Sequence, residues 1–398
     1  MERRKSFMKK WLVRTILGGG DPGDPEVRQR CGVRAGAVGV ALNILLFLGK
    51  LGVGLASASV AIVADAVNNL SDAASSVVTL AGFRMAGRAA DRKHPFGHGR
   101  MEYVAGLVVA MAILLMGFEV GQSALTALFR PEETAISLLT VLVLCASIGV
   151  KLFLFRFDRM LGRTIGSATL EAAAADSLSD TVSTGVVLLS ALAGQLFHLH
   201  VDGLAGLLVA FFILRTGWEA AMDTLDPLLG RPMDPALAGE VERLAGQQPD
   251  ILGIHDLVYH DYGPGRSMLT LHAEVPAELD VLTVHRQIDL LERELWTRRG
   301  IEAVIHMDPV LRDPETERLR RRAACFAREL HPALNVHDVQ LTRCGEEAEL
   351  RLEVAIPYGL PLDPEEVRRV LTEKLRGAAP TVHPSIRVER SYVEEDPR

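Results

Sequence analysis

Two pairs of oxygen-bearing side chains stand four residues apart within long apolar stretches: Asn68 with Asp72, and Asp176 with Asp180. Residues four apart on a helix lie on nearly the same face, about 6 Å apart along the axis, so each pair can point to one spot. A charged Asp at bilayer depth costs about 2.5–3.5 kcal/mol even on the lenient insertion scale. Converging oxygen ligands inside a membrane therefore indicate a cation site on a transport route.

Further polar residues share the face of the first pair. At about 100° per residue, Asp65, Asn68, Asn69 and Asp72 form one stripe, roughly a third of the helix circumference wide. Asp65 lies two turns from Asp72, about 10 Å away, too far to share one ion with it. We expect Asp65 and Asn69 to be auxiliary residues of the transport path. Spacing alone does not choose between Asn68 and Asn69, and helix–helix hydrogen bonding is the alternative role for both.

The elements that must hold these residues follow from composition. The chain has 398 residues, 48% of them hydrophobic, but its two halves differ. Ala, Val, Leu and Gly dominate residues 33–225, whereas residues 231–398 hold most of the Arg, Glu, Asp and His. A membrane domain followed by a soluble domain is predicted. No basic, aromatic-rich face indicates nucleic acid, and four cysteines without CxxC spacing predict neither a disulfide framework nor a zinc knot.

Six stretches are long enough to span a bilayer, at roughly 20 residues each: about 33–56, 59–86, 101–129, 133–155, 168–196 and 203–225. Basic residues crowd the second and fourth connections, which the positive-inside rule assigns to the cytoplasm. We expect a multi-pass protein of the cell (inner or plasma) membrane with both termini cytoplasmic. Residues 1–30 are a basic cytosolic segment whose start, Met1 to Leu17, is predicted as an interfacial helix, and residues 31–228 are the transport domain.

Three motifs together resemble the cation diffusion facilitators, which are dimeric six-helix metal/proton antiporters. They are Asp65-Ala-Val-Asn68-Asn69-Leu-Ser-Asp72, His94-Pro-Phe-Gly-His98-Gly-Arg100-Met-Glu102 and Asp176-Ser-Leu-Ser-Asp180. The resemblance covers about residues 30–310. It implies a homodimer in the lipid bilayer and a transport metal site made of Asn68, Asp72, Asp176 and Asp180.

The donor types at this site bear on the metal. Zinc-exporting members resemble this chain except that a His usually stands at Asp176, and often an Asp at Asn68. Imidazole suits zinc, whereas carboxylate and carbonyl oxygens suit manganese. We therefore expect export of divalent metal, Mn²⁺ first and Fe²⁺ next, with a zinc, cobalt or cadmium exporter as the alternative. Zn²⁺ stays possible because it also accepts carboxylates.

Protons are the expected counter-substrate, because metal binding displaces them from carboxylates. No nucleotide-binding motif or nucleophile–base constellation occurs, so neither an ATPase nor another enzyme is predicted, and no organic cofactor. Two other classes compete with metal/proton antiport. One is a membrane-tethered metal sensor, and the other is a proton-coupled transporter of another cation such as Na⁺.

The loop after the second span offers a second cluster. Asp91, His94 and His98 match positions that bind a metal in some relatives, and a solvated structural loop is the alternative. The resemblance also suggests that Arg100 pairs with Asp226 as an interlock between the membrane and soluble domains.

Residues 233–312 show the order helix, strand, strand, helix, strand, which predicts an α+β module like the family's ferredoxin-like cytosolic domain. Its possible metal site, by resemblance to zinc-binding relatives, comprises His255, His272, His285, His306 and Asp308. Surface or packing roles for these histidines are the alternative.

Residues 316–398 repeat this module at a spacing of about 80 residues. Ile254-His255-Asp256-Leu257 is echoed by Val336-His337-Asp338-Val339. Glu353 and Ile386 map close to His272 and His306, so most of the histidines are lost. A second ferredoxin-like module with a scaffolding or dimer-supporting role is predicted.

Overall fold

The computed structural model describes residues 24–56, 60–129, 137–197, 202–311, 313–344, 347–357 and 359–391. The interfacial helix predicted for Met1 to Leu17 lies outside them. The chain forms two compact units. The first comprises residues 1–230 together with 262–265, and the second comprises residues 231–261 and 266–398.

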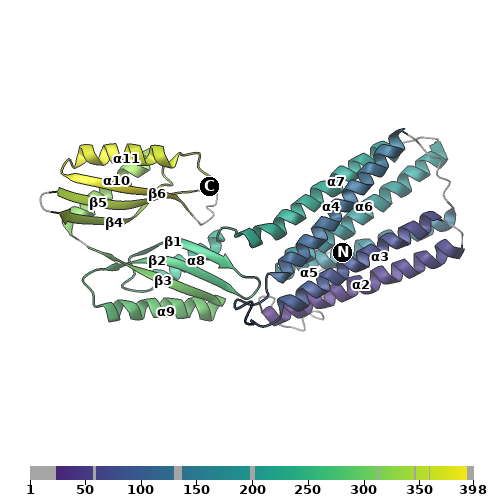
Figure 1. Cartoon of the computed structure of the whole chain (residues 1–398), viewed down its shortest axis with the longest axis horizontal. Helices are drawn as coiled ribbons and strands as arrows, with labels where there is room; N and C mark the ends of the chain where they lie inside the picture. Colours follow the sequence, from purple (N-terminus) through teal and green to yellow (C-terminus); the bar gives the residue numbers. More distant parts are fainter. Residues whose placement is uncertain are drawn as a thin grey trace, which may run out of the picture. The chain divides into compact units, whose positions relative to one another are not determined.

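Long helices make up the first unit and run side by side in Figure 1. They are α2 (Pro25–Ala56), α3 (Val60–Ala86), α4 (Met101–Phe129), α5 (Leu138–Ile165), α6 (Ala168–Phe197) and α7 (Asp202–Leu229). Within the described residues, four helices are long and apolar enough to cross a membrane: α2, α4, α5 and residues 203–229 of α7. The other two, α3 and α6, carry the polar pairs, which lower their hydropathy.

Two helix boundaries differ from the predicted spans. Helix α2 begins at Pro25, eight residues before the apolar stretch, because Asp24 caps it: the Glu26 N–H donates to Asp24 Oδ1 at 2.9 Å. Helix α5 continues to Ile165, and Gly166 then ends it in the left-handed conformation, with φ of 61°. Polar and basic first and last turns extend these helices beyond the apolar segments that sequence hydropathy detects.

The helices pack chiefly as α4 against α7, α2 against α3, and α5 against α6. Small residues allow this close approach. A Cβ added at Gly106 of α4 would lie 2.6 Å from Thr224 Cγ2 of α7, and one at Gly36 of α2 would lie 2.8 Å from Leu80 Cβ of α3. Side chains larger than hydrogen at these positions would push the paired helices apart.

A buried ion pair joins three parts of this bundle. Arg28 of α2 donates to Glu102 Oε1 of α4 at 2.7 Å, and the Glu102 side chain is only 2% exposed. The Ser167 hydroxyl, just before α6, donates to the same oxygen at 2.6 Å. Thr169 Oγ1 donates to the Glu102 carbonyl oxygen at 2.6 Å. The carboxylate is therefore fully paired, which is what a buried charge requires.

The second unit begins with the predicted α+β order. Helix α8 (Pro235–Ala245) precedes β1 (Gly253–Asp261) and β2 (Ser267–Pro276), and α9 (Val281–Arg299) precedes β3 (Ile301–Val310). Strand β2 is central, antiparallel to β1 and parallel to β3. Alternate residues of β2, Leu269, Leu271 and Ala273, form the core with α8 and α9.

The same order follows once more. It comprises α10 (Pro314–Leu330), β4 (Asn335–Cys344), β5 (Glu347–Ile356), α11 (Pro364–Ala378) and β6 (Val382–Arg390). Strand β5 is antiparallel to β4 and parallel to β6, and this module has its own core. In Figure 1, α10 and α11 cover the outer side of the sheet β4–β5–β6, and α9 covers the outer side of the sheet β1–β2–β3. The two sheets therefore lie between these helices. Residues 233–310 and 314–390 are called the first and second modules below.

Both modules share one local irregularity. Asp256 in β1 and Asp338 in β4 have φ of 52° and 47°, and these are the only positive values for non-glycine residues in the described part of the chain. The register shifts directly after His255 and after His337, which is the sign of a β-bulge. Asp tolerates this left-handed conformation better than most residues. The bulge lets consecutive side chains, His255 and Asp256, reach one place.

Strand register corrects one sequence mapping. In the first module His272 pairs with His306, and in the second Glu353 pairs with Arg387. Arg387, and not Ile386, therefore occupies the position of His306. Ile386 is buried in the core, 8% exposed, whereas Arg387 points outward. The earlier mapping was one residue off, which in a strand exchanges the two faces.

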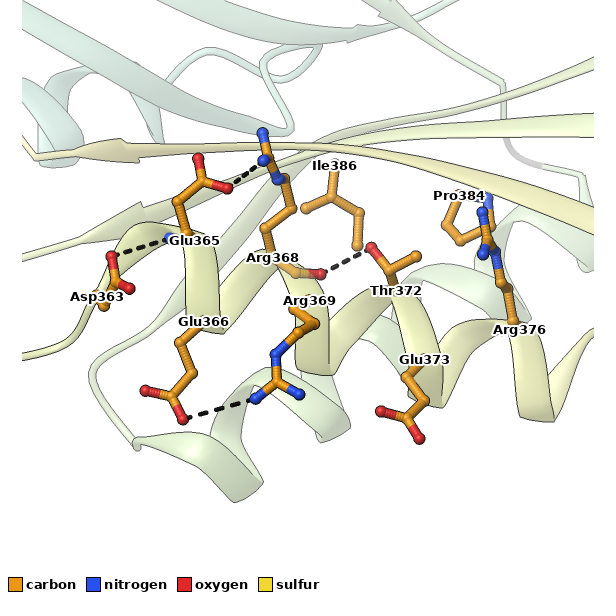
Figure 2. A pocket seen from close by; sticks show the side chains of 10 residues that line it. All are labelled: Asp363, Glu365, Glu366, Arg368, Arg369, Thr372, Glu373, Arg376, Pro384 and Ile386. Carbon is orange, nitrogen blue, oxygen red and sulfur yellow. Dashed lines mark hydrogen bonds and ion pairs between the residues drawn. The ribbon is translucent and has the colours of Figure 1, made fainter.

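The outer face of α11 carries mixed charge. Figure 2 shows Arg368 beside Glu365 and Arg369 beside Glu366, with Asp363 capping the helix by accepting from the Glu365 N–H. A shallow groove between α11 and β6 lies under these side chains. Two of its arginines, Arg368 and Arg369, pair with glutamates three residues away, as is usual for an exposed helical face.

Candidate metal centre

Three predicted carboxylates meet between α3 and α6. Asp72 of α3 and Asp176 and Asp180 of α6 each offer one oxygen, and these oxygens lie within 4.8 Å of one another. Asp72 and Asp180 are buried, at 6% and 4% exposed. The spacing of four residues on α6 places Asp176 and Asp180 on one face, as the sequence predicted. Three acidic groups at such separation repel one another unless cations neutralise them.

A lysine that the sequence analysis missed joins this cluster. Lys151 of α5 is buried at 3% exposed, and its Nζ lies 2.7 Å from Asp72 Oδ2 and 2.5 Å from Asp180 Oδ2. It bridges the two helices that supply the carboxylates. The available signal was a charged residue within an apolar span, since intramembrane lysines usually have an acidic partner. Its partners were not predictable, because they lie 79 and 29 residues away.

The asparagines differ from the expectation. Asn69, and not Asn68, contacts Asp72: its Nδ2 donates to Asp72 Oδ2 at 3.1 Å. Asn69 is 2% exposed, and its buried carbonyl oxygen has no hydrogen-bond partner among the described residues. The Asn68 side chain is exposed. A rotation of 100° separates neighbouring residues on a helix, so the helix packing decides which of them faces the carboxylates. The Asp65 side chain lies outside the described part.

Charge counting shows what this arrangement can hold. With every group ionised, Asp72, Asp176 and Asp180 carry three negative charges and Lys151 carries one positive charge. The remaining charge of −2 is balanced by one divalent cation. Carboxylate oxygens and an amide carbonyl are hard donors of the kind that Mn²⁺ and Mg²⁺ prefer.

The loop between α3 and α4 brings together its three predicted residues. His94 Nδ1 lies 3.3 Å from Asp91 Oδ1, and His98 Nε2 lies 3.4 Å from Asp91 Oδ2. The two imidazole rings are 4.6 Å apart between centroids. Hydrogen bonds from the backbone N–H groups of His94 and Lys93 hold the pKa of Asp91 below its usual value. The carboxylate is thus ionised and positioned by the turn.

In the first module, three of the five predicted residues form one group. His255 of β1, His272 of β2 and Asp308 of β3 each offer an atom within 4.8 Å of the others, with His272 Nδ1 at 2.8 Å from Asp308 Oδ2. The His306 Nε2 lies 3.3 Å from the other Asp308 oxygen. Burial alone would lower the pKa of His255, but the carboxylates of Asp256 and Asp308 outweigh it and raise the pKa to about 10.

The fifth predicted residue, His285, is not a member of this group. It lies on the exposed surface of α9, where its Nδ1 is 3.2 Å from Asp289 Oδ1. One helical turn separates the two residues, so a local contact accounts for its position.

A further group spans the two modules and was not predicted. Asp256 of β1, His337 of β4, Glu353 of β5 and Glu389 of β6 each offer an atom within 4.8 Å of the others. Burial and the neighbouring Asp256 carboxylate raise the pKa of Glu389 to about 7. The repeated His-Asp dipeptide was the only sequence signal for this group.

Comparison with known proteins supplies the family. Residues 37–229 match the model of the cation efflux transmembrane domain, and residues 233–310 match that of the cation efflux protein cytoplasmic domain. The chain belongs to the cation diffusion facilitator family. It is a membrane transporter for cation efflux, as the three sequence motifs predicted, and it is not an enzyme.

Relatives in this family align with about two thirds of the chain. An uncharacterized transporter of Methanocaldococcus jannaschii is 29% identical, with 67% of this chain and 95% of the relative covered. The cation-efflux pump FieF of Cronobacter sakazakii is 30% identical, covering 69% and 92%. The manganese efflux system protein MneS of Bacillus subtilis is 26% identical, covering 69% and 94%. The second module lies beyond both matched family models.

Proposed function

We propose that this transporter exports a divalent metal ion, Mn²⁺ in preference and Fe²⁺ next, in exchange for protons. The observation that carries the proposal is the meeting of Asp72, Asp176 and Asp180 within 4.8 Å. All three donors are oxygens, which favours manganese over zinc. A relative from Bacillus subtilis is named as a manganese efflux protein, which gives independent support for manganese. Export of zinc, cobalt or cadmium is the alternative within the family.

Asn69 is the best candidate for a fourth oxygen ligand. Its carbonyl oxygen is buried and has no hydrogen-bond partner in the described part of the chain, and its amide already contacts Asp72. A partnerless buried oxygen is costly unless a cation or water satisfies it. The resemblance gives this role to Asn68, whose exposed side chain would need α3 to rotate before it reached the metal. Asp65 remains an auxiliary candidate.

Lys151 supplies the coupling in this proposal. Its ammonium holds Asp72 and Asp180 when no metal is present, and an arriving Mn²⁺ takes over those oxygens. Protons that enter from outside neutralise the carboxylates and release the metal. The net charge of −2 left beside Lys151 favours a divalent over a monovalent cation such as Na⁺.

The rest of the arrangement is proposed on the same basis. Helices α2 to α7 are the six spans, with both termini in the cytoplasm, in the plasma or inner membrane and as a homodimer. The second module is a tandem repeat of the first, since both share their element order and their His-Asp bulge.

The loop group and the first-module group are accessory metal sites. Unchanged metal stoichiometry in Asp91→Ala would remove the loop from this set. The proposed pairing of Arg100 with Asp226 is tested by transport in Arg100→Ala.

Proteoliposomes test the transport proposal. Purified protein is reconstituted, a pH gradient is imposed, and uptake of Mn²⁺ is measured against competing Fe²⁺, Zn²⁺ and Na⁺. We expect Mn²⁺ uptake driven by the proton gradient and abolished in Asp180→Asn. The exposed Glu171→Gln on the same helix is the matched control and should retain transport. Uptake that is independent of the pH gradient, or that survives in Asp180→Asn, would refute the proposal.

A further inference from the structure

Each cytoplasmic module presents a set of three ligand side chains at the same place. Strand register makes His255 equivalent to His337 and His272 equivalent to Glu353, because each pair of residues is cross-strand matched beside the bulge. By the same register, Glu389 beside Ala355 occupies the place of Asp308 beside Glu274. The second module therefore keeps the arrangement of the first, and only the change from His272 to Glu353 replaces a nitrogen donor by an oxygen donor. Sequence alone suggested a module that had lost its ligands.

The two sets face each other. The rings of His255 and His337 lie 4.4 Å apart between centroids, although the residues are 82 positions apart in the chain. His337 Nε2 lies 3.4 Å from Asp256 Oδ1 of the first module and 3.8 Å from Glu353 Oε2. Ligands held at about 2.1 Å around one metal are separated by roughly 3.4 Å in a tetrahedron. These atoms are thus near coordination distance from one another.

The imidazole of His337 points independently to a ligand. It is 5% exposed, and neither of its nitrogens has a hydrogen-bond partner among the described residues. Buried ring nitrogens are normally hydrogen-bonded, so a bound cation would satisfy a nitrogen that none of the described residues satisfies. Carboxylates surround the ring on the sides of Asp256 and Glu353, which is suited to a cation.

Electrostatics agree with a divalent ion. With every carboxylate ionised, Asp256, Glu353 and Glu389 carry three negative charges, and the exposed Arg387 neutralises one at the rim, with its Nη1 3.1 Å from Glu353 Oε1. Its Nη2 lies 3.4 Å from Glu389 Oε2. The other oxygen of Glu353 faces His337. One nitrogen and three oxygen donors suit first-row divalent metals such as Zn²⁺, Fe²⁺ and Mn²⁺.

We propose that the two cytoplasmic modules close on a divalent metal ion held by Asp256 of the first module and by His337, Glu353 and Glu389 of the second. The ion joins the modules within one chain, because its ligands come from both. Its four ligands are different residues from the first-module group of His255, His272 and Asp308, and His255 lies between the two groups, in contact with Asp256 and Asp308. The proposal does not depend on the transport proposal. Its role is to sense cytosolic metal, because the bound ion fixes the packing of the two modules against each other.

Metal stoichiometry in the full-length protein tests the site. Equilibrium dialysis in detergent, with Mn²⁺ alone and with Zn²⁺ alone, gives the ions bound per chain. We expect His337→Gln and Glu389→Gln each to weaken one site by roughly tenfold or more. The matched controls are His383→Gln, an exposed histidine on the same strand β6, and Glu349→Gln on β5, and both should bind as the parent protein does. Equal binding in all four variants and the parent would overturn the proposal.

Hydrogen exchange locates the ion. Metal should slow amide exchange in both β1 (Gly253–Asp261) and β4 (Asn335–Cys344) of the full-length protein, and His337→Gln should remove the effect on β4. His306→Gln, which alters the first-module group, should leave the protection of β4 in place. Metal-dependent protection confined to β1–β3 would assign the ion to the first module alone and overturn the inference. Transport is a separate readout, so failure of this site leaves the transport proposal unaffected.

Discussion

Lys151 Nζ lies 2.5 Å from Asp180 Oδ2, so an ammonium contacts an oxygen of the carboxylate cluster through which the metal is proposed to pass. The same nitrogen lies 2.7 Å from Asp72 Oδ2. The Lys151 ammonium is thus a cation fixed to the protein, and it competes with the transported metal ion for these carboxylate oxygens. Opposite charges about 4 Å apart attract by about 4 kcal/mol at the effective dielectric of a partly solvated protein site. The transported ion must replace that attraction.

Removing the tethered cation should tighten metal binding. For Lys151→Met we expect an affinity for Mn²⁺ about tenfold higher or more, because each 1.4 kcal/mol of lost competition is about tenfold. Turnover should fall, since release slows. Metal binding by dialysis and transport in proteoliposomes measure the two effects. Lys50→Met, another buried lysine in a membrane helix, is the control and should bind Mn²⁺ as before. Unchanged or weaker binding in Lys151→Met would show that the lysine does not compete.

Ligand type should control metal preference. Asp176→His replaces one carboxylate ligand by an imidazole. Imidazole suits Zn²⁺, whereas carboxylate oxygens suit Mn²⁺. We expect the ratio of Zn²⁺ to Mn²⁺ transport to rise by roughly tenfold, measured by competition in proteoliposomes. Glu171→His, on the exposed face of α6 near the same end, controls for an added histidine. A ratio that stays at the parental value in Asp176→His would mean that donor type does not set selectivity.

The buried ion pair of Arg28 and Glu102 should be essential for bundle stability. Glu102→Ala leaves the largely buried Arg28 guanidinium with only its hydrogen bond to the Gly166 carbonyl oxygen and without its charged partner. Removing one partner of a buried ion pair costs about 3–5 kcal/mol. Thermal unfolding in detergent should show a marked decrease in midpoint. Glu219→Ala removes the exposed pair with Arg215, whose side chains are 60% and 70% exposed. Because exposed pairs contribute about 0–1 kcal/mol, this control should change the midpoint little. Similar midpoints for the two variants would contradict the role given to Glu102.

The cap of α10 should give a pH-dependent contribution. Hydrogen bonds from the Thr316 side chain and from the Thr316 and Glu315 N–H groups lower the pKa of Asp313. A lowered pKa means that the folded state favours the carboxylate, so its stabilisation is present above the unfolded value of about 3.9 and is lost as pH falls through the folded value. Asp313→Ala should therefore weaken α10 by about 1 kcal/mol near neutral pH and by much less under strong acid.

Amide exchange of α10 (Pro314–Leu330) in the full-length protein measures this effect, with variant and parent compared at each pH. Asp363→Ala removes the matched cap of α11 and should change exchange in α11 alone. If Asp313→Ala altered α10 equally at all pH values, the carboxylate charge would have no part in the cap.

The sequence by itself predicted the three carboxylates that meet between α3 and α6, and the order of the elements in the first module. Hydropathy located the apolar segments, and the i, i+4 spacing placed Asp176 and Asp180 on one face of α6, because helix geometry is local. The His-Asp echo predicted a second module, and residues 314–390 do have the same element order as residues 235–310, with α10 and α11 as their helices. The sequence mapping of β6 was wrong by one residue: Ile386 was assigned to the position that Arg387 occupies beside Glu353.

Only the tertiary structure decided which residues meet. The rotation of α3 in the bundle set Asn69 rather than Asn68 beside Asp72, and packing of α5 brought Lys151 to both carboxylates. The packing of one sheet on the other placed His337 against Asp256. These contacts join residues far apart in the chain, and their formation depends on how whole elements pack, which no local pattern encodes.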